Sequence, residues 1–136
     1  MPKHLVVSCC HAPHVRPRRR NLHTLSEDDL IADITALSLA PAWLLHDANS
    51  LHEFLPLLRS DYELAETYRH ESGAPIDVPI TAVAAAEDKV ALRDDVAAWR
   101  LHTSREFALI DMGSSGHDLA TTHPERFLPL MLERPA

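Results

Sequence analysis

Several features that would assign the chain to a particular protein class are missing. No apolar run approaches the roughly 20 residues that span a membrane, and the start, MPKHLVVSCC, lacks the long apolar region of a signal peptide. The two cysteines, Cys9 and Cys10, are adjacent in the sequence, so a disulfide between them would not join distant parts of a fold. We therefore expect a cytoplasmic protein without disulfides and without membrane contact.

The sequence also lacks the charge and the motifs of a nucleic-acid-binding or metal-binding protein. Its formal net charge of -7 disfavours non-specific binding to nucleic acid and to anionic membranes. Ten histidines are present, but there is no C-x-x-C motif and no histidine pair spaced for one face of a predicted helix. We predict no nucleic-acid partner, no metal and no cofactor.

What is present is the pattern of an α/β fold in a single domain, residues 1–136. The hydrophobic content of 46% is typical of a folded globule. Apolar runs predict buried strands at residues 4–10, 78–86 and 107–112, and helices begin near residues 26, 41, 50, 94 and 124. Ser26 is a predicted N-cap, and Ser50 with Glu53 forms a predicted capping box. Strands that alternate with helices indicate about three parallel strands with flanking helices.

Polar side chains follow two of the predicted strands. Glu87 and Asp88 come after the second strand, and His117 follows the third in the loop GSSGH. The carboxyl ends of parallel strands meet at one edge of a sheet, so an acid and a histidine can pair there. Such an acid would orient the imidazole and stabilise its cation, as in hydrolases whose triad runs nucleophile, acid, histidine. The alternatives are a structural hydrogen-bonded pair and an acid that caps the following helix.

Four segments carry a resemblance to a known family: LPLLRSDYELAETYRH (55–70), PIDVPITAVAAAEDKV (75–90), AAWRLHT (97–103) and GHDL (116–119). They resemble the C-terminal half of a type II thioesterase, an α/β-hydrolase that accompanies polyketide and nonribosomal peptide synthetases. The resemblance implies a partial α/β-hydrolase fold in which helices at about 26–70 form a lid. It also implies that Asp88 is the acid and His117 the general base. The substrate would be an acyl or peptidyl thioester on the phosphopantetheine of a carrier protein or synthase.

The serine nucleophile of that family is missing. No G-x-S-x-G motif occurs, and GSSGH differs in spacing and follows the last predicted strand. We expect the serine to belong to a half that this chain does not contain. On the resemblance, we favour a thioesterase-like enzyme. The alternatives are an acid/base enzyme (a dehydratase, isomerase or cyclase) and a non-catalytic protein that binds a carrier or synthase.

Other residues are weaker candidates for the site. Cys10 and Cys9 end the first predicted strand at the same sheet edge, where a thiolate paired with His117 would be a nucleophile; buried cysteines also serve as small hydrophobic residues. The loop arginines Arg16, Arg18 and Arg19 could bind an acidic carrier protein or its phosphate, or remain solvated. Tyr62 would line the acyl channel or belong to the core of the lid.

The first predicted strand would normally have a neighbour on its free side. An apolar edge strand without that neighbour favours pairing with another chain. We therefore expect either a homodimer or a complex with a complementing N-terminal half, formed through this strand.

Overall fold

A computed structural model describes residues 2–132. The chain divides into two compact units, one formed by residues 1–15 and 70–136 and the other by residues 16–69. The second unit holds most of the segment that the sequence assigned to a lid. Within the described residues, no helix has both the length and the apolar character needed to cross a membrane.

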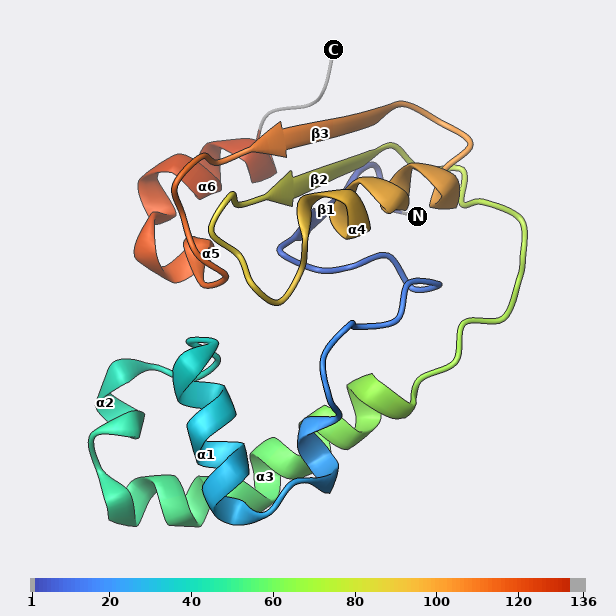
Figure 1. The fold of residues 1–136 in the computed structure, drawn as a ribbon. Coiled ribbons are helices and arrows are strands. Elements are labelled where there is room, and N and C mark those ends of the chain that lie inside the picture. Colours follow the sequence, from blue (N-terminus) through green and yellow to red (C-terminus); the bar gives the residue numbers. More distant parts are fainter. Residues whose placement is uncertain (1, 133–136) are drawn as a thin grey trace. The chain divides into compact units, whose positions relative to one another are not determined.

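The first unit is built on a sheet of three parallel strands. They are β1 (Leu5–Ser8), β2 (Ile80–Ala84) and β3 (Phe107–Asp111), in the spatial order β1-β2-β3 (Figure 1). In the register of the sheet, Ile80 is paired with Leu5 on one side and with Phe107 on the other. The predicted fold class is confirmed: the unit is a parallel α/β sheet with flanking helices.

Helices cover both faces of this sheet, which explains why β2 is apolar at nearly every position. On one face, Ala82 and Ala84 pack with residues of α4 (Arg93–Ala97) and the 3-10 helix η2 (Ala98–His102). On the other face, Val83 packs in a cluster that includes residues of α5 (Leu119–Thr122) and α6 (Pro124–Leu132). In Figure 1, α4 and the α5–α6 pair are on opposite sides of the strands. Alternate residues of β2 therefore supply two separate cores.

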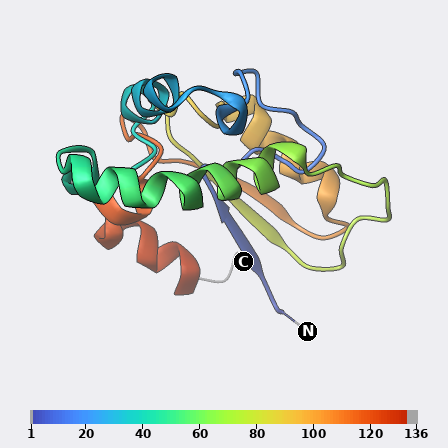
Figure 2. The same ribbon diagram turned by 90° about the horizontal axis from the view of Figure 1, so that it is seen from below.

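The second unit contains only helices. It consists of the 3-10 helix η1 (Leu22–Thr24), α1 (Glu27–Ala36), α2 (Ala42–Leu45) and α3 (Ala48–Thr67), and Figure 2 shows α3 as the long green helix. One aliphatic core holds these helices together: Leu22, Leu30, Ile34, Leu44, Leu51 and Leu55. The predicted cap of α1 is confirmed, since the Ser26 hydroxyl accepts a hydrogen bond from the Asp29 amide at 3.2 Å.

The predicted capping box at the start of α3 is wrong. The helix begins three residues earlier than expected, and its N-cap is Asp47. The Asp47 carboxylate accepts hydrogen bonds from the amides of Asn49 and Ser50 and from the Ser50 hydroxyl. A carboxylate satisfies the first free amides of a helix and also interacts favourably with the helix dipole, so Asp47 outcompetes Ser50 for the cap.

Candidate active site

The loops that leave β2 and β3 are joined to each other by backbone hydrogen bonds. The Ala86 amide donates to the Gly113 carbonyl at 2.8 Å, and the Glu87 amide donates to the Ser115 carbonyl at 3.1 Å. These bonds hold the residue after Glu87 close to the segment that carries His117. The parallel topology therefore brings together two side chains that are 29 residues apart in the sequence.

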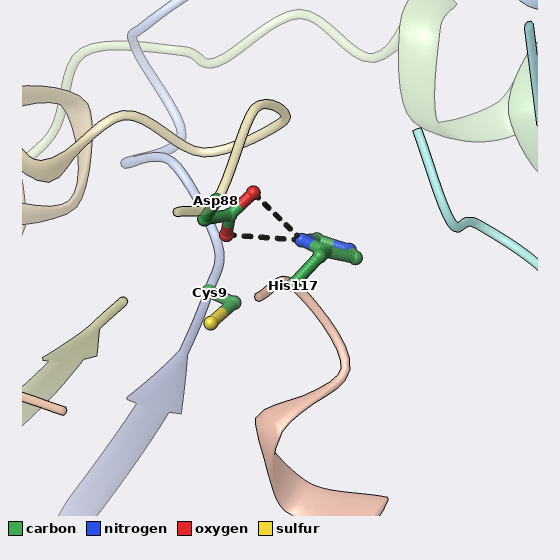
Figure 3. A group of neighbouring side chains, drawn as sticks. All are labelled: Cys9, Asp88 and His117. Carbon is green, nitrogen blue, oxygen red and sulfur yellow. Dashed lines mark hydrogen bonds and ion pairs between the residues drawn. The ribbon is translucent and has the colours of Figure 1, made fainter. Parts of the chain in front are cut away.

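Asp88 and His117 form a direct pair, as Figure 3 shows. The His117 Nδ1 atom lies 3.2 Å from Asp88 Oδ1 and 3.1 Å from Oδ2. The Asp88 side chain is fully buried, and the His117 side chain is 28% exposed. The acid is thus enclosed by protein while one part of the imidazole reaches solvent.

The protonation of the pair follows from the surroundings of Asp88. Burial alone raises the pKa of this carboxyl, but hydrogen bonds from His117 and from the Ala91 and Val90 amides outweigh it, so the pKa lies below its usual range. An ionised carboxylate only accepts hydrogen bonds, so Nδ1 of His117 must carry the shared hydrogen. The neutral imidazole then has its free electron pair on Nε2, which is the arrangement of a general base.

Glu87 and Ser115, two neighbouring polar residues in the same loops, do not belong to the Asp88–His117 pair. Glu87 is exposed, and it is Asp88 that contacts His117. Ser115 is buried, and its hydroxyl donates to the Met112 carbonyl at 3.2 Å. Gly113 has a φ of 65°, a left-handed conformation that a glycine adopts without strain. The GSSGH segment is therefore a tight turn that positions His117.

Cys9 lies beside the pair at the end of β1 (Figure 3). Its φ is 48°, a conformation that residues other than glycine seldom adopt. Burial, followed by the negative charge of Asp88, raises the pKa of the Cys9 thiol to about 12. A thiol with this pKa is protonated near neutral pH, which weighs against a thiolate nucleophile.

Cys10, the other candidate nucleophile, is exposed. Its carbonyl accepts a hydrogen bond of 2.9 Å from the indole of Trp99 in η2. The two adjacent cysteines therefore have different environments, and only Cys9 belongs to the group formed with Asp88 and His117.

The sequence contains no metal-binding motif, yet the fold gathers three donors of the kinds that bind metals. The Cys9 sulfur, one Asp88 oxygen and one His117 nitrogen all lie within 4.8 Å of one another. No local motif marks this group, because its three residues follow three different strands and are far apart in the sequence. Only the predicted sheet topology could have indicated this group.

The arginines and Tyr62 belong to the helical unit. Arg19 contacts the buried carboxylate of Glu66 at 2.5 Å, and its guanidinium lies 6.0 Å from the centre of the Tyr62 ring. Arg19 is therefore engaged inside this unit, together with the half-buried Tyr62. Arg16 and Arg18 are exposed, whereas Arg19 is partly buried.

Sequence reasoning also missed a group of histidines in the sheet unit. His14 Nδ1 and His102 Nε2 are 2.7 Å apart, and the His70 ring centre lies 5.0 Å from that of His102. Burial lowers the pKa of His102, and the charges of His14 and His70 lower it further. Segments around residues 14, 70 and 102 thus converge on one cluster, which no local sequence pattern indicates.

Comparisons with known proteins give the same family for almost the whole chain. A family model described as a thioesterase domain matches residues 1–130. The thioesterase PikA5 of Streptomyces venezuelae is 41% identical over 108 residues, which is 79% of this chain and 38% of that protein. The gramicidin S biosynthesis protein GrsT of Aneurinibacillus migulanus is 32% identical over 108 residues, 79% of this chain and 42% of its own. The chain thus spans about two fifths of these relatives.

Solved structures of thioesterases also match this chain. The RedJ thioesterase of the prodiginine pathway in Streptomyces coelicolor superposes with a TM-score of 0.82 at 33% identity, covering 96% of this chain and 48% of that one. The type II thioesterase BorB from the borrelidin biosynthetic cluster gives a TM-score of 0.84 at 29% identity, covering 96% and 53%. Nearly the whole chain, including the helical unit, therefore corresponds to about half of each solved protein.

Proposed function

Since this chain belongs to the family of thioesterase domains, we propose that it supplies the acid and the base of a thioesterase active site. The proposed substrate is an acyl or peptidyl group held as a thioester on the phosphopantetheine of a carrier protein in polyketide or nonribosomal peptide biosynthesis. The observation that carries this proposal is the buried Asp88 carboxylate that orients the partly exposed His117 ring.

In the proposed reaction, Nε2 of His117 takes the proton of a serine hydroxyl while the serine oxygen bonds to the thioester carbonyl carbon. The carbon–sulfur bond then breaks, and the imidazolium returns the proton to the departing thiolate. Water attacks the acyl-serine with the same assistance from His117, which releases the acid and restores the serine. The Asp88 carboxylate stabilises the imidazolium in both steps.

The serine is not available in an elbow motif within these 136 residues. We assign it to the part of the relatives that this chain does not span. The relatives RedJ and BorB come from prodiginine and borrelidin biosynthesis, which supports a substrate bound to a carrier protein. The exposed Arg16 and Arg18 are the proposed contacts to the acidic carrier surface, and the proposal requires no cofactor beyond the phosphopantetheine of the substrate.

The test uses a chimera in which this chain replaces the matching segment of PikA5. An acyl-carrier protein is incubated with the chimera or with the chain alone, and its mass is followed by mass spectrometry. We expect release of the acyl group by the chimera. Asp88→Asn and His117→Gln should each lower its rate by about 10²–10⁴-fold. The matched control is Glu87→Gln, which changes the exposed neighbouring acid and should leave the rate within about twofold of that of the parent chimera.

Three outcomes contradict the proposal. Equal rates for the parent chimera, Asp88→Asn and His117→Gln would remove the pair from the reaction. Loss of water from an acyl group that stays on the carrier would instead support a dehydratase. Binding of the carrier with no change of mass, by a chimera that is folded by circular dichroism, would support a non-catalytic binding protein.

A further inference from the structure

Three strand ends converge on one small group of donors. Cys9 follows β1, Asp88 follows β2, and His117 follows β3, so the parallel sheet brings the three residues of the group together. Its sulfur, oxygen and nitrogen lie within 4.8 Å of one another. In a tetrahedral zinc site with bonds of about 2.0–2.3 Å, such donors are about 3.3–3.7 Å apart, a distance that side-chain rotation can close.

The kinds of donor select the metal. One thiolate, one imidazole and one carboxylate form a mixed set that suits zinc, while Mg²⁺ and Ca²⁺ prefer ligands that are all oxygen. Cys9 and Asp88 are buried, and His117 is 28% exposed, so the group contacts solvent on the side of His117. Two further observations mark the position as unusual: Cys9 has a left-handed backbone, and its thiol is buried against a carboxylate.

We propose that Cys9, Asp88 and His117 form a zinc-binding site at the carboxyl edge of the sheet. Zn²⁺ takes the place of the thiol proton, which passes to the solvent. The neutral His117 ring keeps its single proton but moves it from Nδ1 to Nε2, so that Nδ1 binds the metal. The Asp88 carboxylate supplies the third bond, and water occupies the fourth position.

This site and the acid/base pair use the same atoms. With zinc on Nδ1, the Asp88–His117 hydrogen bond is broken, and Nε2 carries a proton instead of a free electron pair. Zinc binding and use of His117 as a general base therefore exclude each other, which makes the ion an inhibitor of any base catalysis by the pair. The binding itself does not depend on the proposed thioesterase activity.

The experiment uses the 136-residue chain, stripped of metal and reduced with a phosphine. Zn²⁺ is titrated by calorimetry, and Co²⁺ replaces it for absorption spectroscopy, where a sulfur-to-cobalt charge-transfer band reports the thiolate. We expect one ion per chain and this band. Cys9→Ser should abolish the band and weaken zinc binding by about 10–100-fold, and Asp88→Asn should weaken binding while retaining the band. Mg²⁺ should give no heat of binding.

Two matched controls locate the metal. Cys10→Ser changes the exposed neighbouring cysteine and should leave both the band and the affinity unchanged. His14→Gln removes one of the two hydrogen-bonded histidines and should also have no effect. The proposal is overturned if Zn²⁺ does not bind, if Cys9→Ser binds it as the parent does, or if Cys10→Ser or His14→Gln abolishes binding. Circular dichroism confirms that each variant is folded.

Discussion

The Asp88 side chain contacts both the His117 ring and its own loop, but it does not cap the following helix, whose N-cap is Leu92. Its Oδ1 atom accepts the Val90 amide at 2.7 Å and the Ala91 amide at 3.0 Å, and both carboxylate oxygens lie near His117. The acid therefore organises the loop that follows β2 while it orients the imidazole. A residue that ties its own loop in this way keeps a fixed position, and a fixed acid is what a histidine base requires.

At the residue scale, His102 predicts a pH dependence of stability. Its pKa lies below the usual value of about 6.5 because burial and the charges of His14 and His70 disfavour the cation. Between that lowered pKa and about 6.5, the unfolded chain binds more protons than the folded chain, so the free energy of unfolding falls as the pH decreases. His102→Gln should flatten this fall, measured by urea unfolding at about pH 7 and about pH 5.5.

The exposed His46 provides the control for this prediction. His46→Gln should keep the pH dependence of the parent chain. A slope that is the same in His102→Gln and in the parent would show that the cluster of His14, His70 and His102 does not contribute to the acid sensitivity.

At the scale of an element, the C-terminal part of α3 is anchored by one buried carboxylate. Glu66 accepts hydrogen bonds from Arg19, from the His23 ring and from the amides of Leu22 and His23, and its side chain is only 3% exposed. Burial raises the pKa of Glu66, but these hydrogen bonds outweigh it, so the pKa lies below its usual range. An ionised Glu66 thus joins α3 to η1 and to the arginine loop.

Glu66→Gln should therefore lower the free energy of unfolding of the helical unit by about 3 kcal/mol, because it leaves buried donors facing an amide that accepts at only one atom. Denaturant unfolding followed by far-ultraviolet circular dichroism measures this loss. Glu63→Gln changes an exposed acid of the same helix and should shift the free energy by less than about 0.5 kcal/mol. Equal effects of the two substitutions would contradict the anchoring role.

At the scale of the whole molecule, the outer edge of β1 is the feature that bears most on assembly with another chain. Within residues 2–132 it pairs only with β2. The amides of Leu5 and Cys9 donate to residues 79 and 83, so by the alternation of a strand the amides of Val6 and Ser8 face the free edge. A second apolar surface is nearby in the same unit, because Leu128 and Met131 of α6 are each 55% exposed.

We predict that the isolated chain pairs through this edge, either with a second copy or with the complementing part of a thioesterase. Sedimentation at micromolar concentration should show a dimer or larger species. Val6→Pro removes one outward amide while leaving the β2 hydrogen bonds in place, and it should shift the chain toward monomer. A parent chain that sediments as a stable monomer would refute the prediction.

The sequence by itself determined the elements with strong local patterns. The β-branched and apolar runs determined the three strands, because a parallel sheet covered by helices admits few polar residues in its strands. The order strand, acid, helix, strand, histidine indicated that Asp88 and His117 would meet, because parallel strands end at one edge. The similarity of four segments to thioesterases indicated the family, which the comparisons confirm.

Only the tertiary structure decided which side chains meet across long sequence separations. It selected Asp47 over Ser50 at the start of α3, buried Glu66 beneath Arg19, and brought His14 to His102. It also selected Cys9 over Cys10 as the cysteine beside Asp88 and His117, although Cys9 and Asp88 are 79 positions apart in the sequence. The physical reason is that local periodicity determines which face of an element is apolar, while the packing of those faces determines which polar groups share a site.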